Sequence, residues 1–361
     1  MTEARQASGV RGTKVAVYSV VDNGDALVDA LGDGWRDAMS NVFDCNGTRL
    51  RIWRTLCLAV VALASSTSLV SAQEATPAPA WQTLAPIPQA RSELAAAVIG
   101  ARMYVVGGFG GGERVDRFDT ETGEWQRVAD LPGAVHHPGV AALDGFVYVA
   151  GGYRIDDLTE LSAVWAYDPA ADTWERRADL PTPRGALGLA ALDGRLYAVG
   201  GARRQLSGPV TGEVEVYDPA ADTWQSRADL LTPREHLAVV AGDGRLFAVG
   251  GRANGDEGDA FAGANEAYDP VTDRWESLSA LPAPRGGLTG VYAAGHVVVL
   301  GGERGTTTFA NADAFDPTTN AWTALPPMPT ARHGLASAVV DDTIYAITGS
   351  GKGGAVENTP V

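Results

Sequence analysis

A fixed interval that follows a tryptophan in six repeats predicts an all-β protein built as a propeller. The interval runs from Trp81 to Gly107 in the first repeat, and it has the same length in the other five. In five repeats it ends at the first glycine of a Gly-Gly pair, whereas Thr348 takes that place in the sixth. The six tryptophans are Trp81, Trp125, Trp174, Trp224, Trp275 and Trp322. Their spacing of 44 to 51 residues indicates one small unit copied around an array.

The third repeat shows how one unit divides into four strands. Residues 187–192 form an apolar run with small side chains, which suits an inner strand, and Asp193-Gly194 is a hairpin turn signal. Residues 196–201 form a second buried strand. Residues 214–217 alternate apolar and polar as a half-exposed strand does, and residues 223–225 open the fourth strand after a turn. Four short antiparallel strands, repeated radially, describe a propeller blade.

The spacing within each unit resembles the kelch repeat. A Gly-Gly pair follows an apolar run, an acidic residue stands two positions before an aromatic residue, and a tryptophan follows that aromatic residue by seven. The acidic–aromatic pairs are Asp116/Phe118, Glu215/Tyr217, Glu266/Tyr268 and Asp313/Phe315. The resemblance covers residues 81–361 and departs from the pattern at Trp165, which replaces the acidic residue, and at Thr348. The glycine pairs are interpreted as crowded backbone positions with positive φ, without a phosphate-binding role.

The two ends of the array predict how the ring closes. The last unit ends after residues 354–358 without reaching a tryptophan, whereas the first unit begins with an extra one, Trp81. The strand of Trp81 is therefore expected to be the fourth strand of the last blade, which gives a six-bladed kelch β-propeller closed by its N-terminal strand. Closure removes the exposed sheet edges that an open array would leave.

The segment before the repeats has the pattern of a secretory signal. Arg49, Arg51 and Arg54 precede the apolar residues 56–64, and Val70-Ser71-Ala72 supplies small residues for cleavage after Ala72. Nine apolar residues are too few to cross a bilayer as a helix, so a stable membrane anchor is not expected. The domain prediction is a mis-assigned or disordered extension over 1–48, a signal peptide over 49–72, a Pro/Ala-rich leader over 73–80 and the propeller over 81–361. Met39 is then the favoured start, in place of Met1.

The charge balance limits the classes of partner. Residues 1–72 hold seven basic and seven acidic residues, so the net charge of −16 falls on residues 73–361. An acidic protein of this kind is not expected to bind nucleic acid. Both cysteines, Cys45 and Cys57, precede the expected cleavage site, so disulfides are not expected to stabilise the secreted or periplasmic protein.

Insertions fall in one connection of each unit, the one between the second glycine and the third-strand aromatic residue. This connection is shortest between Gly108 and Phe118 and longest between Gly251 and Tyr268, whereas the other intervals are constant. These loops and the starts of the inner strands share one face, and insertions gathered on one face of a repeat protein usually mark its binding face.

Candidate ligand-binding residues lie at the starts of the inner strands. Five units place an arginine at one fixed interval before the second strand, at Arg91, Arg184, Arg234, Arg285 and Arg332, with Val135 in the second unit. These arginines are interpreted either as a cationic mouth that binds carboxylates or sulfates or, with equal weight, as scaffold residues that tie neighbouring blades. Four of the five histidines follow at the next two positions, among them His236 and His333, the other two candidate ligand-binding residues. Solvated loop histidines are the default interpretation, a metal site from His137, His236 and His333 is less favoured, and neither a metal nor a cofactor is expected.

The favoured function is a secreted, non-enzymatic recognition module that binds a glycan, an acidic small molecule or a protein at the loop face. The kelch resemblance also implies an alternative, a mutarotase or epimerase that acts on an acidic sugar such as a sialic acid. For that activity Glu93, Glu235, His137 and His236 are the candidate proton-transfer residues. A galactose-oxidase type of copper-radical chemistry would need a cysteine cross-linked to tyrosine, and no cysteine follows residue 72.

Overall fold

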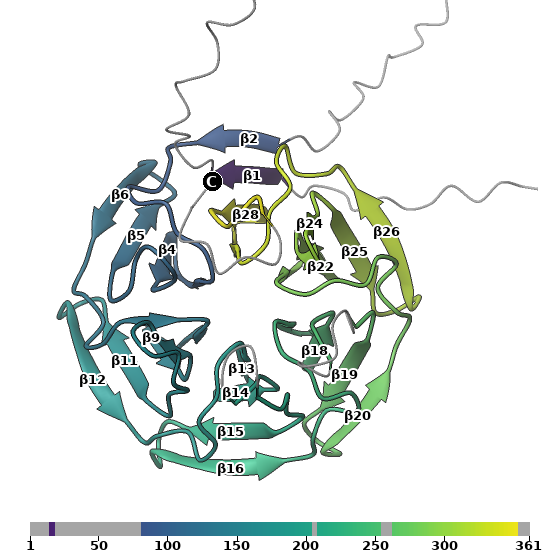
Figure 1. Ribbon diagram of the computed structural model, residues 1–361, viewed down its shortest axis with the longest axis horizontal. Coiled ribbons are helices and arrows are strands. Elements are labelled where there is room, and N and C mark those ends of the chain that lie inside the picture. Colours follow the sequence, from purple (N-terminus) through teal and green to yellow (C-terminus); the bar gives the residue numbers. More distant parts are fainter. Residues whose placement is uncertain (1–13, 19–80, 204–207, 254–261, 353–361) are drawn as a thin grey trace, which may run out of the picture. The chain divides into compact units, whose positions relative to one another are not determined.

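The computed structural model describes residues 14–18, 81–203, 208–253 and 262–352. The expected signal peptide and the leader over 73–80 lie outside these residues. The described repeats fold into an all-β propeller whose sheets surround a central axis (Figure 1). Among the described residues, no helix has the length and apolar character needed to cross a membrane.

Five sheets of the described chain are antiparallel and have four strands each, joined in order from the axis outwards. The first contains β3 (Ala95–Ile99), β4 (Arg102–Val106), β5 (Val115–Asp119) and β6 (Glu124–Arg127). The second contains β8 (Gly139–Leu143), β9 (Phe146–Ala150), β11 (Val164–Asp168) and β12 (Thr173–Arg177). The third contains β13 (Gly188–Leu192), β14 (Arg195–Val199), β15 (Val214–Asp218) and β16 (Thr223–Arg227).

The fourth and fifth sheets repeat this order. The fourth contains β17 (Ala238–Gly242), β18 (Arg245–Val249), β19 (Asn265–Asp269) and β20 (Arg274–Ser277). The fifth contains β21 (Thr289–Ala293), β22 (His296–Leu300), β25 (Ala312–Asp316) and β26 (Ala321–Leu325). Two short ladders accompany the sheets: β7 (Val135–His136) with β10 (Tyr153–Arg154), and β23 (Glu303–Arg304) with β24 (Thr307–Thr308).

The last sheet differs from the other five. Its inner strands, β27 (Ala336–Val340) and β28 (Thr343–Ile347), are antiparallel, but β1 (Lys14–Tyr18) runs parallel to β28 and to the outermost strand, β2 (Trp81–Leu84). The prediction of six antiparallel blades is therefore not confirmed, because five are found in the described part of the chain. The sequence did not predict a strand at 14–18, and the expected third strand at 354–358 lies outside the described residues.

Two circles of contacts join neighbouring sheets. Each repeat tryptophan donates from its indole N–H to the carbonyl oxygen four residues after the preceding tryptophan, at 2.8 to 3.0 Å. Trp81 continues this circle by donating to Pro326 at 2.8 Å. Apolar side chains are packed between neighbouring sheets, and one cluster joins Met103 and Phe118 of the first sheet to Tyr345 and Ile347 of the last.

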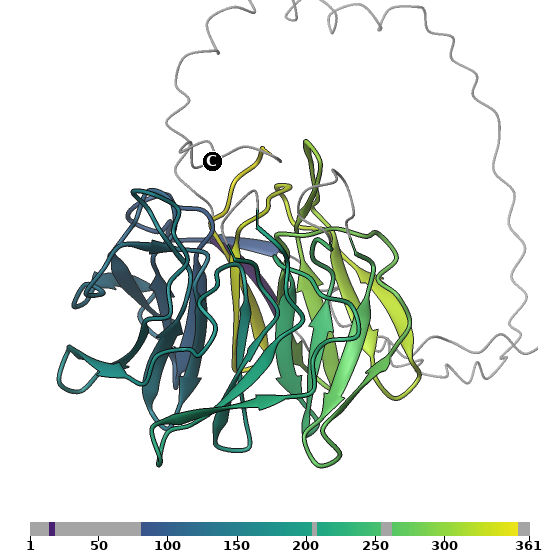
Figure 2. The same cartoon turned by 60° about the horizontal axis from the view of Figure 1, so that its bottom comes forward.

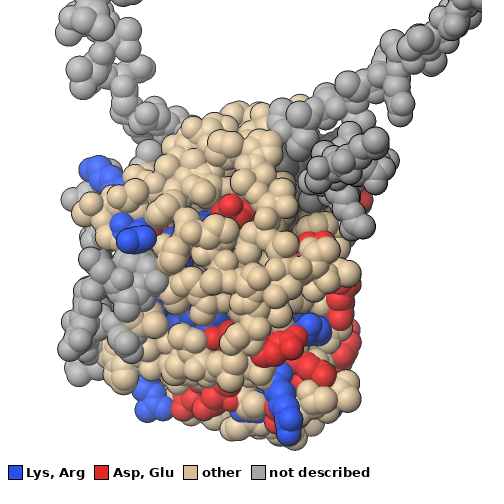
Figure 3. Space-filling model, turned by 90° about the vertical axis from the view of Figure 1, so that its right-hand side faces the viewer, with Lys and Arg blue, Asp and Glu red and all other residues tan. Residues whose placement is uncertain are grey.

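Glycine permits close packing where each second strand ends. Gly200 has φ of +63°, and a Cβ there would lie 2.6 Å from the carbonyl oxygen of Arg234 in the next repeat. Glycine avoids both the strain and the clash at this position, so the Gly-Gly pairs are structural, as expected, and Thr348 takes the equivalent place in the sixth repeat with φ of 48°. The longer connections lie on the upper side of the ring in Figure 2 and the short hairpin turns on the lower side. On the outer side that Figure 3 shows, acidic and basic side chains are interspersed.

Candidate functional site at the mouth of the central channel

Each repeat begins its inner strand with one residue in the left-handed region. These residues are Glu93, His137, Ala186, His236, Gly287 and Gly334, with φ between 51° and 61°. Four of the six are not glycine, although this backbone conformation favours glycine. Positive φ in non-glycine residues is a cost that often accompanies function, so their side chains are candidates for a functional role.

The peptide groups of these six residues form a closed circle of hydrogen bonds, the axial ring. The N–H of each residue donates to the carbonyl oxygen of the equivalent residue in the preceding repeat, and Glu93 donates to Gly334. The six N···O distances lie between 2.8 and 3.0 Å. The axial ring fixes the backbone of every repeat around one mouth of a central channel with a volume of about 430 Å³, which the inner strands line.

A second layer of residues surrounds the axial ring. The residue before each ring position pairs, as in a β-bridge, with the residue that follows the Gly-Gly pair of its own repeat, or Thr348-Gly349 in the sixth. The pairs are Ser92 with Phe109, His136 with Tyr153, Gly185 with Ala202, Glu235 with Arg252, Gly286 with Glu303 and His333 with Ser350. The starts of the inner strands and the variable loops therefore meet at the same mouth.

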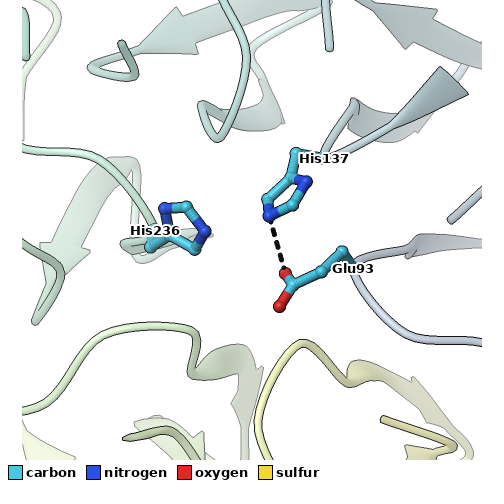
Figure 4. Close-up of side chains that lie close together, drawn as sticks. All are labelled: Glu93, His137 and His236. Carbon is cyan, nitrogen blue, oxygen red and sulfur yellow. Dashed lines mark ion pairs between the residues drawn. The ribbon is translucent and has the colours of Figure 1, made fainter. Parts of the chain in front are cut away.

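Glu93 lies among imidazoles on one side of the mouth. Its Oε2 is 3.1 Å from His137 Nε2, and its Oε1 is 3.3 Å from His333 Nε2 (Figure 4 draws the first pair). His333 Nε2 also lies 3.5 Å from Glu303 Oε2. The side chains of these four residues are between 4% and 12% exposed, so their charges interact with little screening by water.

His236 lies among charged groups on the other side. Its Nδ1 is 3.3 Å from Glu235 Oε1 and 2.7 Å from Nη2 of Arg252. Arg252 also lies 3.2 Å from Glu235 and 3.6 Å from Glu303. Its side chain is 28% exposed, so this guanidinium is accessible at the mouth.

The electrostatic environment shifts the pKa values of these carboxyl groups and imidazoles in different directions. Burial opposes ionisation of Glu93, but the charges of His137 and His333 and their hydrogen bonds outweigh it and hold its pKa well below the usual range. Burial likewise opposes ionisation of Glu235, yet His236 and Arg252 lower its pKa to about 2. Burial, followed by the charge of Arg252, lowers the pKa of His236. Burial alone would lower the pKa of His333, but the hydrogen bond to Glu93 and the carboxylate charges raise it.

The predicted cationic mouth is not formed by the five repeat arginines. Their residues are at most 5% exposed, and four of them pair with the acidic residue of the third strand in their own repeat. The pairs are Arg91–Asp116 at 2.6 Å, Arg184–Glu215 at 2.5 Å, Arg234–Glu266 at 2.9 Å and Arg285–Asp313 at 2.7 Å. Arg332 donates to the carbonyl oxygen of Thr348 at 3.0 Å. The geometry therefore favours the scaffold interpretation.

The sequence contained a signal for this scaffold role. The second repeat lacks the arginine, which is Val135, and it also lacks the acidic residue, which is Trp165. Both members of the ion pair are thus missing from the same repeat. If the arginine bound an external ligand, its absence from a repeat would not require the absence of the acidic residue from the third strand.

The candidate proton-transfer residues do come together. Glu93, His137, Glu235 and His236 all lie at the mouth, with His333 beside them. The interpretation of the histidines as solvated loop residues is wrong, because His137, His236 and His333 are 3% to 8% exposed.

Residues that follow the Gly-Gly pairs were missed. Arg252, Glu303, Tyr153 and Phe109 all stand one position after a pair, and a constant offset from the glycines could have found them. Ionised carboxylates beside imidazoles of differing pKa can accept hydrogen bonds from hydroxyl groups, transfer protons or ligate a cation.

Comparisons with known proteins agree with this architecture. A family model described as the KLHDC2/KLHL20/DRC7 Kelch-repeats domain matches residues 79–230, and the Kelch motif matches residues 233–282 and 284–329. Among solved structures, one titled "Structure of YjhT" is similar with a TM-score of 0.67 and 15% identity over 75% of this chain and 93% of that one. At this identity the likeness shows the fold alone. A search of curated proteins by sequence finds no match.

Proposed function

The chain belongs to the kelch-repeat family of β-propellers, and on this premise we propose that it is a non-enzymatic recognition module. Its ligand binds at the channel mouth, on the face of the variable loops. The observation that carries the proposal is the cluster of Glu93, Glu235, His236 and Arg252 where the loops and the axial ring meet. Function in repeat proteins concentrates on the face that collects insertions.

The polar groups of the mouth favour a glycan over a protein partner. Glu93 and Glu235 are held ionised and offer acceptors for sugar hydroxyl groups. Arg252 is a partly exposed cation beside Glu235, and its planar fork suits a carboxylate or sulfate on the ligand. An acidic glycan satisfies both kinds of group.

Titration calorimetry with matched neutral and acidic oligosaccharides tests this proposal. Arg252→Ala is expected to weaken binding of the acidic ligand about 10-fold or more, since a charge-assisted hydrogen bond is worth roughly 1.5–3 kcal/mol. Arg245→Ala is the matched control: its side chain is 30% exposed, it pairs with Glu276, and it lies at the opposite end of the same repeat. Equal losses in both variants, or no binding of any glycan by the unmodified protein, would contradict the proposal.

A mutarotase or epimerase acting on an acidic sugar is the second candidate. The contact of His236 with both Glu235 and Arg252 supports it, because a proton-transfer pair then stands beside a group that can hold a sugar carboxylate. Glu235→Gln should then abolish accelerated exchange between anomers, measured by NMR, while affinity changes little. If the protein only binds the sugar, the unmodified protein does not accelerate exchange between anomers.

The proposed recognition function includes two further points: the propeller has six blades, and the protein acts outside the cytoplasm. The six members of the axial ring and the six tryptophan contacts support a sixth blade between β26 and β3. The arginine-flanked apolar residues 56–64 and the small residues before Gln73 support export.

A further inference from the structure

We propose that Glu93, His137 and His236 bind a divalent transition-metal cation at the channel mouth, with His333 as an additional ligand. The residues come from three repeats and converge on the axis (Figure 4). One donor atom of each lies within 4.8 Å of the donor atoms of the other two. The site shares Glu93 and His236 with the proposed recognition cluster, but its test uses metal ions alone and needs no organic ligand.

The spacing is near that of a metal centre. Ligand atoms on a tetrahedral zinc ion with bonds of about 2.0–2.1 Å are roughly 3.4 Å apart. His137 Nε2 and Glu93 Oε2, at 3.1 Å, already have a similar separation. His333 Nε2, 3.3 Å from the other oxygen of Glu93, is placed to complete the set. The donor atom of His236 lies within 4.8 Å of the other donor atoms, so its side chain must rotate to reach the same point.

Outer groups hold two imidazoles through the nitrogen that faces away from the cation. His236 Nδ1 lies 3.3 Å from the carboxylate of Glu235, and His137 Nδ1 lies 2.6 Å from Nδ1 of His136. Metal-ligating histidines almost always donate from their other ring nitrogen to a carboxylate, a backbone carbonyl or water, which fixes the tautomer and the ring orientation, and Glu235 is such a partner for His236. Nε2 of His137 faces Glu93, whereas Nε2 of His236 contacts Arg252 and becomes available to a cation only when that guanidinium moves.

The backbone conformation of the three proposed ligand residues is strained, and such strain is unexpected unless these side chains have a function. Glu93, His137 and His236 occupy positions of the axial ring with φ of 54°, 55° and 51°. Gly287 and Gly334 fill equivalent positions, so glycine is compatible with the ring. Side chains that accept this conformation at three of six positions, and point at one another, are consistent with a shared ligand.

The donor set indicates the class of metal. Two or three imidazoles and one carboxylate suit zinc, copper(II) or nickel(II), whereas calcium and magnesium prefer oxygen ligands. Arg252 opposes a cation, because its Nη2 lies 2.6 Å from Nε2 of His236. Its partly exposed side chain can shift onto Glu235 and Glu303, which it already contacts, when a cation binds.

The test is titration of the chelator-treated full-length protein with Zn²⁺ by calorimetry, and with Co²⁺ by visible absorption. We expect one equivalent of either ion to bind. His137→Ala, His236→Ala and Glu93→Gln should each weaken Zn²⁺ affinity by more than the roughly 10- to 100-fold that loss of an outer partner costs. His296→Ala is the control, since this half-buried histidine lies at the start of β22 and hydrogen-bonds to the carbonyl oxygen of Ala294, away from the mouth.

Arg252→Met separates the proposal from a general electrostatic effect. It removes a cation beside His236, so Zn²⁺ should bind more tightly, in the opposite direction to the ligand variants. Should a ligand variant fail to fold, the d–d absorption of Co²⁺ in the unmodified protein and the Arg252→Met shift decide the matter. The absence of stoichiometric binding, or an affinity that the ligand variants leave unchanged, would overturn the proposal.

Discussion

At the scale of single residues, the arginines of the repeat stabilise the fold by pairing with buried carboxylates. Arg234 is fully buried, and its guanidinium donates to Glu266 and to the carbonyl oxygens of Thr232 and Ala248. Removing one member of such a pair leaves an uncompensated charge, whereas removing both is tolerated far better. The natural second repeat, with Val135 and Trp165, has the latter arrangement.

Arg234→Met should therefore lower the free energy of unfolding by about 3–5 kcal/mol, the range found when a buried ion pair loses one partner. The double variant Arg234→Met/Glu266→Leu should recover most of this loss. Urea denaturation measures both. Arg176→Met is the control, because Arg176 pairs with Asp179 at the surface and such pairs contribute at most about 1 kcal/mol. A double variant no more stable than the single one would contradict the scaffold role.

Three aspartates before the repeat tryptophans make the stability depend on pH. Asp172, Asp222 and Asp273 adopt positive φ, accept a hydrogen bond from a tyrosine hydroxyl and accept another from a backbone N–H of the preceding repeat. These hydrogen bonds hold their pKa below the ordinary 3.8. A depressed pKa contributes stability that is present above about 3.8 and is lost as pH falls through the lower folded value.

Replacing all three by asparagine should flatten the fall of the melting temperature below about pH 4. Asn320 fills the equivalent position of the fifth repeat, where its side-chain oxygen accepts from the N–H of Ser279 at 2.8 Å. Asparagine therefore preserves the turn and one hydrogen bond but does not titrate. Thermal melts between pH 2 and 6 test this, and an unchanged slope would assign the acid sensitivity to other carboxylates.

At the scale of elements, the sequence predicts the four strands of the third repeat to within one or two residues. The expected runs at 187–192 and 214–217 correspond to β13 (Gly188–Leu192) and β15 (Val214–Asp218). The alternation of apolar and polar residues and the turn residues are local signals, so they can be recognised in a single sequence. The strand β1 was missed, because its place between β28 and β2 is set by pairing across the chain.

The candidate site was predicted in part for the same reason. The inner-strand starts and the variable loops were assigned to one face from constant spacings, which placed Glu93, His137 and His236 correctly at the mouth. Their burial depends on closure of the axial ring between repeats, which no local pattern reveals. The arginines were ambiguous because their carboxylate partners lie 25 to 32 residues away in sequence.

The outer strand β2 should contribute to stability through Trp81. Its indole donates to Pro326 at 2.8 Å, and its ring packs against the core between the fifth and last sheets. Trp275→Ala should cost about 3–5 kcal/mol, as for other buried aromatic residues. Trp81→Ala should cost less, because Trp81 is half-buried whereas Trp275 is 8% exposed. Chemical denaturation of the two variants gives the order, and a Trp81→Ala variant as stable as the parent would argue against closure by β2.

At the scale of the whole molecule, export would change the composition of the last sheet. Cleavage after Ala72 removes β1, which in the full chain lies between β28 and β2. We expect the protein isolated from its native host to begin at Gln73. N-terminal sequencing or intact mass measures this directly, and a product that retains Met1 would instead make β1 a permanent part of the fold.

The axial ring has a further consequence for how the propeller opens. Every peptide group in a closed circle is both donor and acceptor to its neighbours, so no member of the circle lies at a frayed end. The N–H groups of Glu93, His137, Ala186, His236, Gly287 and Gly334 should therefore exchange with deuterium together and slowly, although they border a channel mouth. Local opening of one sheet would have to break two bonds of the circle, so we expect these amide groups to be among the last in the described residues to exchange.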